Sequence, residues 1–382
     1  MRPNRSLHLA ALIACSTALA TTPGCAKKDA PATAQTAQPA EPSAKAGEGG
    51  KAEKASADQA KAVVDRARLA IFAPLAGEVT AATGPATPAQ VALGQMLYFE
   101  KRLSKNQDLS CNSCHMLDRG GVDGSARSSG HKGQLGGRNA PTVFNAAAHL
   151  AQFWDGRAKD VEEQAKGPIL NPIEMAMPSA EAVVAVLVSM PEYVAAFQAA
   201  FPGQADPVTY DNLGKAIGAF ERQLTTPGRW DAYLKGDDKA LTDEEKAGLA
   251  LFLDTGCMAC HNGAALGGGS YQKLGAVKPW PNLKDNGRYD ATKDEADKFK
   301  FKVPSLRNIA QTGPYFHDGS VQTLEEAVKL MATHQLGRDL DDAKVKSLVT
   351  WLKALNGEAP KELTAQPALP PSSATTPKAD PT

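Results

Sequence analysis

The distribution of apolar residues along the chain predicts a protein built mainly of helices. Apolar residues recur three and four positions apart in 207–224 and 341–355, the pattern of a helix with one buried face. Another helix is expected over Pro88–Phe99, because Thr87 can cap it and proline is favoured at a first helical position. The sequence has no long alternating runs of the kind that predict a sheet. We therefore expect an all-α fold.

Two further threonines mark the starts of helices. Thr242 precedes Glu245 by three positions, and Thr323 precedes Glu326 by three. This is the spacing of a capping box, in which the two side chains bond the free backbone N–H groups of the first turn. We expect a helix after each threonine, with long irregular, glycine-rich loops between the helices.

The first 25 residues have the layout of an export signal. Two arginines precede an apolar run over 7–20, which is too short to span a membrane. Two processing routes fit, cleavage after Ala20 or lipid attachment at Cys25, and the polar tether that follows Cys25 slightly favours the second. We expect a periplasmic protein, with a lipid anchor at Cys25 as the membrane-tethered alternative.

Both ends of the mature chain have the composition of flexible tails. Residues 26–58 and 359–382 are rich in Ala, Pro, Lys, Glu, Ser and Thr and contain too few apolar side chains to offset chain entropy. The folded body is then expected over 59–358. The chain has no net positive charge that would attract a polyanion, because its 42 basic residues balance 42 acidic ones. Nucleic acid is therefore not an expected partner.

The body contains the motif Cys-x-x-Cys-His twice. The motif residues are Cys111, Cys114 and His115 in the first copy and Cys257, Cys260 and His261 in the second. This is the attachment signature of haem c, in which two thiols form thioethers to the porphyrin and the histidine ligates the iron. The sequence therefore predicts two covalently attached haems.

Disulfides and zinc are the alternatives for four such cysteines. A histidine directly after each second cysteine is not expected of a disulfide framework. Zinc sites also use paired Cys-x-x-Cys units, but Cys111 and Cys257 are 146 residues apart (257 − 111), too far for a compact zinc knuckle. Haem attachment is the interpretation that uses all six motif residues.

The motifs belong to a longer internal duplication. Three downstream segments repeat at one offset of 163 residues: 141–145 in 304–308, 153–157 in 316–320, and 161–163 in 324–326. We infer two homologous cytochrome c-like haem domains, 59–225 and 226–358. The offset at the haem motifs is 146, so the second copy has 17 extra residues (163 − 146), which we place in a surface loop over Tyr271–Lys300.

His131 is the candidate second ligand of the first iron. It lies in a stretch without helical or strand pattern, 16 residues after His115 (131 − 115), and Gly130 and Gly133 flank it closely. A lone loop histidine is more often a solvated surface residue. The flanking glycines change that balance, because they allow the backbone to move. A histidine on such a loop can bind the iron and leave it, which would make it a gate.

Met331 is the candidate second ligand of the second iron. It lies on the helix expected after Thr323, where a core methionine is the ordinary interpretation and His334 is a competing ligand. A thioether on a helix gives a permanent His/Met site with a raised reduction potential. The second haem is then the electron reservoir and the first is the reactive centre.

Glu174 and Trp154 are the remaining candidates near the first haem. Glu174 lies in a proline-bounded loop, where an exposed acid is the ordinary interpretation, but over an open haem it could shuttle a proton between peroxide oxygens. Trp154 is the duplication partner of His317 (154 + 163). It is a core aromatic by default, and between the haems it would belong to the electron path.

Together these residues resemble the bacterial di-haem cytochrome c peroxidases, a family that includes the MauG-like oxidases. The resemblance covers about 60–356. It rests on the motifs CNSCH at 111–115, GH at 130–131, RNAPTVFNA at 138–146, FWDGR at 153–157, EQAKGPI at 163–169, NPIEM at 171–175, CMACH at 257–261, PYFHDGS at 314–320 and the Met331 segment ending in QLG at 335–337.

The resemblance implies a role for each candidate. His115 and His131 would ligate a low-potential haem and His261 and Met331 a high-potential one, while Gln164 and Glu174 line the peroxide pocket and Trp154 lies between the haems. It also implies a calcium ion, held by the Asn139 side chain and the carbonyls of Thr312 and Pro314, and a homodimer.

The expected function is reduction of hydrogen peroxide to water with electrons from a small redox protein, a cytochrome c or a cupredoxin. Two alternatives stay open. A plain di-haem electron carrier would leave Glu174 and Gln164 without a role. A MauG-like oxidase of a protein substrate is disfavoured by Met331 and His131, because in that branch tyrosine replaces the methionine and the histidine gate is missing.

Overall fold

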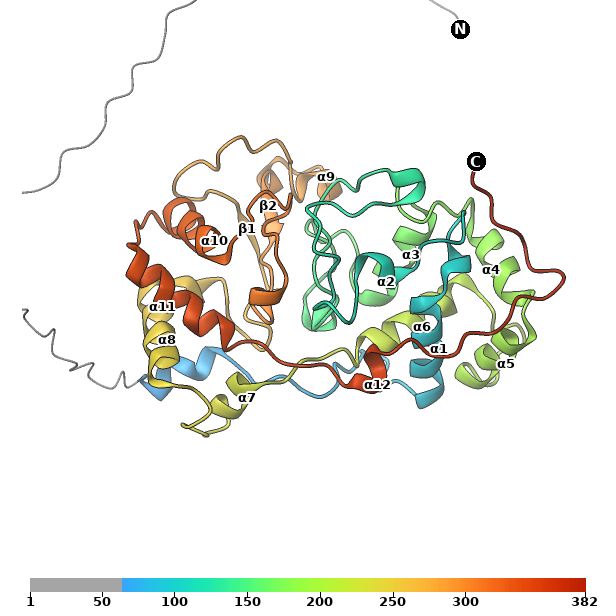
Figure 1. Ribbon diagram of the computed structural model, residues 1–382, viewed down its shortest axis with the longest axis horizontal. Helices are drawn as coiled ribbons and strands as arrows, with labels where there is room; N and C mark the ends of the chain where they lie inside the picture. The colour runs from blue at the N-terminus through green and yellow to red at the C-terminus, as the bar shows by residue number, and fades with distance from the viewer. Residues whose placement is uncertain (1–63) are drawn as a thin grey trace, which may run out of the picture. The chain divides into compact units, whose positions relative to one another are not determined.

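The computed structural model describes residues 64–382 (Figure 1). The predicted export signal, Cys25 and the tether over 26–58 lie outside the described residues. Helices predominate, as expected, and the one named sheet of the described part pairs two short antiparallel strands, β1 (Tyr271–Lys273) and β2 (Lys300–Lys302). The helices are α1 Pro88–Phe99, α2 Cys111–Cys114, α3 Val161–Leu170, α4 Ala180–Val188, α5 Pro191–Ala200, α6 Tyr210–Glu221, α7 Arg229–Leu234, α8 Asp243–Thr255, α9 Tyr289–Thr292, α10 Leu324–Leu330, α11 Asp342–Lys353 and α12 Lys361–Thr364.

The predicted helix starts are confirmed by their caps. Thr87 forms a capping box with Gln90 at the start of α1, and Thr242 forms one with Glu245 at α8. The Thr323 hydroxyl accepts a hydrogen bond from the backbone N–H of Glu326. In residues 64–382 no single helix has the length and apolarity to cross a membrane, and only the pair α4–α5, bent by 106°, passes that test jointly.

Two hydrophobic cores form around equivalent pairs of helices. α1 packs on α6 in the N-terminal core, and α8 packs on α11 in the C-terminal core. Gly94 of α1 and Gly248 of α8 each face the backbone of the opposing helix so closely that a Cβ atom would collide with it. Both crossings therefore depend on glycine for close approach.

The duplicated segments share an unusual backbone. Asn145 and Asn308, 163 residues apart, both adopt the left-handed conformation, with φ of 61° and 59°. Both side-chain amides donate to the Thr226 hydroxyl, at 2.8 and 2.9 Å. Isolated bridges join Gln152 to Ala158 and, at the same offset, Tyr315 to Val321. The repeated sequence thus specifies repeated local structure.

The N-terminal segment packs on the opposite half of the protein from the one predicted. Val64, Leu69 and Phe72 belong to the C-terminal core, and the Phe72 ring meets Trp230 edge to face at 5.4 Å. A domain boundary at residue 59 therefore misassigns this segment. Its few apolar side chains fill a gap beside α7 and α8, which periodicity alone does not reveal.

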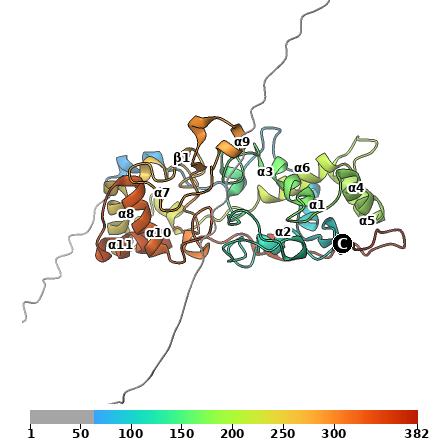
Figure 2. The same cartoon turned by 90° about the horizontal axis from the view of Figure 1, so that it is seen from above.

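The C-terminal tail is ordered, so the expectation of disorder for 359–382 is wrong. The tail, red in Figures 1 and 2, leaves α11 and runs along the helices of the N-terminal core. Leu363 and Leu369 pack against that core, and the backbone N–H of Asp380 donates to the Lys105 carbonyl at 2.8 Å. Its composition suggested disorder, yet a segment with few apolar residues can be held by side chains that bond its free backbone carbonyls. The Gln95 amide bonds three of them and the Arg102 guanidinium a fourth.

Removal of residues 366–382 is expected to destabilise the protein. The deletion exposes the apolar surface under Leu369 and breaks the contacts of Arg102 and Lys105 with the tail. We expect a loss of about 2 kcal/mol, the value of one largely buried leucine. Thermal unfolding of the full and shortened chains measures it, and equal melting temperatures would show that the tail contributes nothing.

Candidate functional site

Each Cys-x-x-Cys-His motif opens onto its own cavity. The first motif lines a cavity of about 630 Å³, here called the N-terminal cavity. The second motif lines a cavity of about 240 Å³, here called the C-terminal cavity. The first motif forms the short helix α2, and the second forms a 3-10 turn, η5 (Cys257–Ala259), directly after α8. The second motif therefore directly follows a core helix, whereas the first forms a short helix of its own.

Both motif histidines are held in the tautomer that an iron ligand needs. The Nδ1 atom of His115 lies 3.0 Å from the Pro141 carbonyl oxygen, and that of His261 lies 3.1 Å from the Leu266 carbonyl oxygen. With Nδ1 donating to a carbonyl, Nε2 is left as the ligand atom. Burial also lowers the pKa of both histidines, to about 4 for His261, so the rings are neutral.

The four motif thiols fit covalent haem attachment. Within residues 64–382 they form no disulfide, and each lines its cavity beside the corresponding histidine. Burial raises the pKa of Cys111 to about 12 and that of Cys257 to about 11, so the unmodified thiols are protonated. The donor set and the cavities therefore match two c-type haems.

Glu174 and Gln164 share the N-terminal cavity with His115. Gln164 lies on α3, whose first turn is capped by the Asp160 carboxylate, and Glu174 lies on the loop that follows α3. Burial raises the pKa of Glu174, and the nearby Arg157 guanidinium opposes that rise. A half-buried carboxyl with a raised pKa has the property required of a general acid–base.

His131 is bound to the backbone that carries Glu174. Its N–H lies 3.0 Å from the Ile173 carbonyl oxygen and 2.8 Å from that of Glu174, and its side chain is buried. Gly130 lies so close to Ile173 that any Cβ atom would collide with the carbonyl. The sequence suggested that Gly130 serves backbone mobility, but its requirement here is close packing. Gly133, with a φ of 72°, supplies the left-handed turn.

Trp154 lies in the wall that the two cavities share. It lines both of them, together with Phe153 and Asn139, and its indole N–H donates to the Asn139 carbonyl at 3.0 Å. Its ring meets that of His317, its duplication partner, edge to face at 6.4 Å. Trp154 therefore lies between the two cavities, and its place between two haems stays a prediction.

The structure distinguishes between Met331 and His334 as candidate ligands of the second iron. Met331 begins a π-helical turn, η8 (Met331–Gln335), and lines the C-terminal cavity with His261. The His334 ring packs beside Trp280, at 5.2 Å between centroids, and its Nδ1 lies 3.2 Å from the Lys278 carbonyl oxygen. Of the two candidates, Met331 is the one that the cavity lining includes.

The three residues predicted to hold calcium line one cavity. Asn139, Thr312 and Pro314 line the C-terminal cavity, and the Asn139 amide N–H group donates to the Ser125 carbonyl at 2.9 Å. Neutral oxygen donors of this kind suit a hard cation such as Ca²⁺. Calcium at this position stays a prediction.

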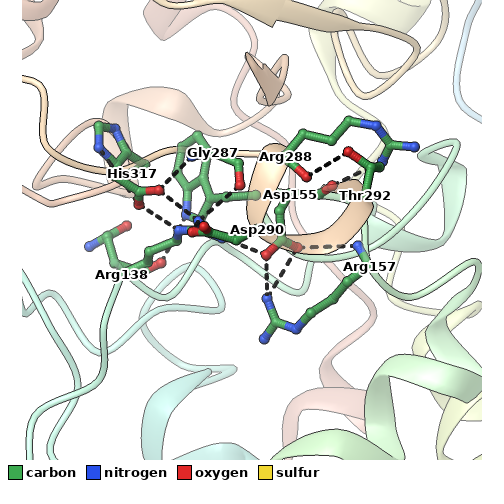
Figure 3. A network of polar contacts seen from close by, with 11 residues as sticks. Arg138, Asp155, Arg157, Gly287, Arg288, Asp290, Thr292 and His317 are labelled. Atoms are coloured by element: carbon green, nitrogen blue, oxygen red, sulfur yellow. Dashed lines mark hydrogen bonds and ion pairs between the residues drawn. The ribbon is translucent and has the colours of Figure 1, made fainter. Parts of the chain in front are cut away.

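Sequence reasoning missed the role of the 271–300 loop. Most of the loop is exposed, as expected, and in addition Lys284, Asp285 and Asn286 line the N-terminal cavity. Arg138 fixes the loop there, because its Nε lies 2.7 Å from the Asp285 carboxylate. Its Nη1 lies 2.6 Å from the Asp155 carboxylate (Figure 3). A single sequence does not show which residues so far apart along the chain form ion pairs.

Glu221 is a second residue that sequence reasoning missed. It ends α6 and lines the N-terminal cavity, where burial, and then the nearby Glu162, raise its pKa to about 8. Position 221 lies on the buried face of α6. A glutamate on the apolar face of a helix is the sequence feature that could have indicated a functional side chain there.

Two cavities, each with a haem-attachment motif, define the class: a redox protein with two c-type haems. A family model described as di-haem cytochrome c peroxidase matches residues 88–239. The cytochrome c551 peroxidase of Pseudomonas aeruginosa is 47% identical over 84% of this chain and 93% of its own length. That of Nitrosomonas europaea is 49% identical over 78% of this chain and 89% of its own.

Solved structures agree with these sequence relatives. The crystal structure of a MauG-like protein associated with microbial copper homeostasis superposes with a TM-score of 0.67 at 29% identity, covering 77% of this chain and 95% of that one. The chain belongs to the di-haem cytochrome c peroxidase family. The prediction of a cytochrome c peroxidase, an oxidoreductase with peroxide as acceptor, is confirmed at this level.

Proposed function

We propose that the protein is a periplasmic peroxidase that reduces hydrogen peroxide to water with electrons from a small cytochrome c or cupredoxin. The observation that carries this proposal is the shared cavity of His115, Gln164 and Glu174. An electron carrier has no need of a titratable side chain beside its haem, whereas O–O bond cleavage requires a proton to move between the two oxygens.

Haem iron, when bound at the two motifs, supplies electron storage and a coordination site for peroxide. The side chains of the N-terminal cavity do the rest. His115 would ligate the iron, and its bond to the Pro141 carbonyl fixes the ring orientation. Glu174, in the same cavity, would accept a proton from one peroxide oxygen and deliver it to the oxygen that leaves as water. Gln164 orients the substrate by hydrogen bonding.

His131 serves as the gate in this proposal. The backbone N–H of His131 bonds the carbonyls of Ile173 and Glu174. A shift of the His131 backbone that took its ring away from the first iron would therefore also move the loop that carries Glu174. A coupled change of this kind would open the iron and bring the acid into place together.

The two halves are proposed to be cytochrome c-like domains with different tasks. His261 and Met331 would give the second haem a permanent, high-potential ligand pair. Trp154, in the shared wall, would provide the electron path between the cavities. A homodimer, a calcium ion at Asn139, Thr312 and Pro314, and a lipid anchor at Cys25 belong to the same proposal.

Peroxide turnover separates this proposal from an electron carrier. The protein is reduced by one electron, mixed with hydrogen peroxide, and supplied with a reduced small cytochrome c or a cupredoxin. Rapid oxidation of the donor, with two donor molecules consumed per peroxide, is expected. Failure of every donor to be oxidised, while both haems remain reducible, would contradict the peroxidase assignment.

Replacement of His131 by glycine is expected to open the first iron in the fully oxidised protein. The substitution removes the imidazole, which is the proposed ligand, and keeps the backbone N–H group that bonds the Ile173 and Glu174 carbonyls. Electron paramagnetic resonance should then show the loss of one nitrogen ligand, whereas His334→Gly should leave the first haem unchanged. If the first iron of the His131→Gly protein stays bound by two nitrogens, the gate is another residue.

A further inference from the structure

Lys302 is a buried cation without a carboxylate partner in residues 64–382. It ends β2 and is 6% exposed. Its ammonium donates to the Ala151 carbonyl oxygen at 2.9 Å and lies 3.2 Å from the Nδ1 atom of His149. Burial lowers the pKa of Lys302 to about 8, and the more distant Asp155 opposes this. An ammonium has three donors, and a buried charge normally has a counter-charge.

His149 presents a second unused donor at the same place. An ammonium can only donate, so Nδ1 of His149 must accept, and the ring proton is on Nε2. This Nε2 atom is buried and has no hydrogen-bond partner in the part of the chain that the structure describes. The ring lies so close to Gly268 that a Cβ atom there would collide with it. The N–H group is therefore held in a fixed position without an acceptor.

Both residues line the C-terminal cavity, together with His261 and Met331. Whatever fills this cavity must bring an acceptor for the two donors, and a negative charge for the ammonium, because unpaired polar groups cost free energy when buried. Haem c has two propionate carboxylates with these properties. We propose that Lys302 and His149 form the binding site for a propionate of the haem attached at Cys257 and Cys260.

This inference rests on the haem attachment that the proposed function also requires. In this proposal Lys302 and His149 position the haem, and the charge of Lys302 also affects the reduction potential of the haem. A cation beside the haem favours the reduced state, since reduction removes one positive charge from the iron. Lys302 also joins the two halves, because its backbone N–H donates to the Trp154 carbonyl at 2.7 Å and its ammonium bonds Ala151.

The test compares reduction potentials of the second haem in the haem-loaded protein. Lys302→Met should shift its reduction equilibrium at least about tenfold toward the oxidised state, or about 59 mV for a one-electron couple. Lys302→Arg keeps the cation and should retain most of the potential. Lys300→Met is the matched control, because Lys300 lies on the same strand but pairs with Asp297. It should leave the potential unchanged.

Equal potentials in Lys302→Met and Lys300→Met would overturn the proposal, whatever their melting temperatures. If Lys302→Met does not fold, a crystal structure of the haem-loaded wild type decides instead. A propionate oxygen is expected within about 2.7–3.2 Å of the Lys302 Nζ atom. Water or a buffer anion there, with both propionates elsewhere, would contradict the site. Fewer than two haems per wild-type chain would contradict the proposed function itself, a separate failure.

Discussion

Replacement of Glu174 by glutamine is expected to suppress peroxide turnover by about a hundredfold or more while both haem spectra stay intact. Loss of a positioned general acid–base typically costs about 10²–10⁴ in rate. Glutamine keeps the size and polarity of the side chain, so the cavity beside His115 should keep its form. Steady-state oxidation of the donor at saturating peroxide measures the effect.

Glu163→Gln is the matched control for this substitution. Glu163 lies on the same helix as Gln164 but faces solvent, where it pairs with Lys166. It should leave turnover unchanged. In the wild type, turnover should fall as the pH drops through the Glu174 pKa, which burial raises, because a protonated carboxyl cannot accept the first proton. Near-normal turnover in Glu174→Gln would refute the assigned role.

Replacement of Arg307 by methionine is expected to cost about 3–5 kcal/mol of stability, the range for breaking a buried ion pair. The Arg307 side chain is 1% exposed and makes two bonds to Asp231, at 2.7 and 2.8 Å. Asp231 also accepts from the backbone N–H groups of Leu75 and Gly228, each at 2.7 Å. The pair therefore joins three segments, and its loss leaves a buried carboxylate unpaired.

Urea unfolding at several pH values measures this contribution. Burial alone would raise the pKa of Asp231, but the Arg307 guanidinium holds it below its ordinary value. The stabilisation is thus present at neutral pH and is lost as the pH falls through the folded-state pKa. Arg229→Met, which removes the half-exposed pair with Glu245, should cost less than about 1 kcal/mol. Equal losses in the two variants would contradict the account.

Features encoded by neighbouring residues could be predicted from the sequence. The bounds of α1, the capping box at Thr242 and the haem motifs depend on spacings of a few residues. The duplication was readable because one offset recurs, and it aligned Trp154 with His317, but the contact between their rings is known only from the structure.

Features that depend on distant partners could not be predicted. The tail beyond residue 358 is held by side chains such as Gln95 and Arg102, which precede it by more than 250 residues. Arg138 and Asp285 pair across 147 residues. In the same way, Lys302 reads as an ordinary strand lysine until the structure shows its burial. A single sequence records composition, but it does not record which distant groups meet.

Spectroscopy of the first haem in the oxidised and the half-reduced protein tests the central claim most directly. Electron paramagnetic resonance and absorption spectra, recorded before and after addition of one electron, report the ligands of that iron while the second haem becomes reduced. The account predicts nitrogen ligation by both His115 and His131 in the oxidised state and loss of the His131 ligand on half-reduction. An iron that keeps both nitrogen ligands after half-reduction would contradict it.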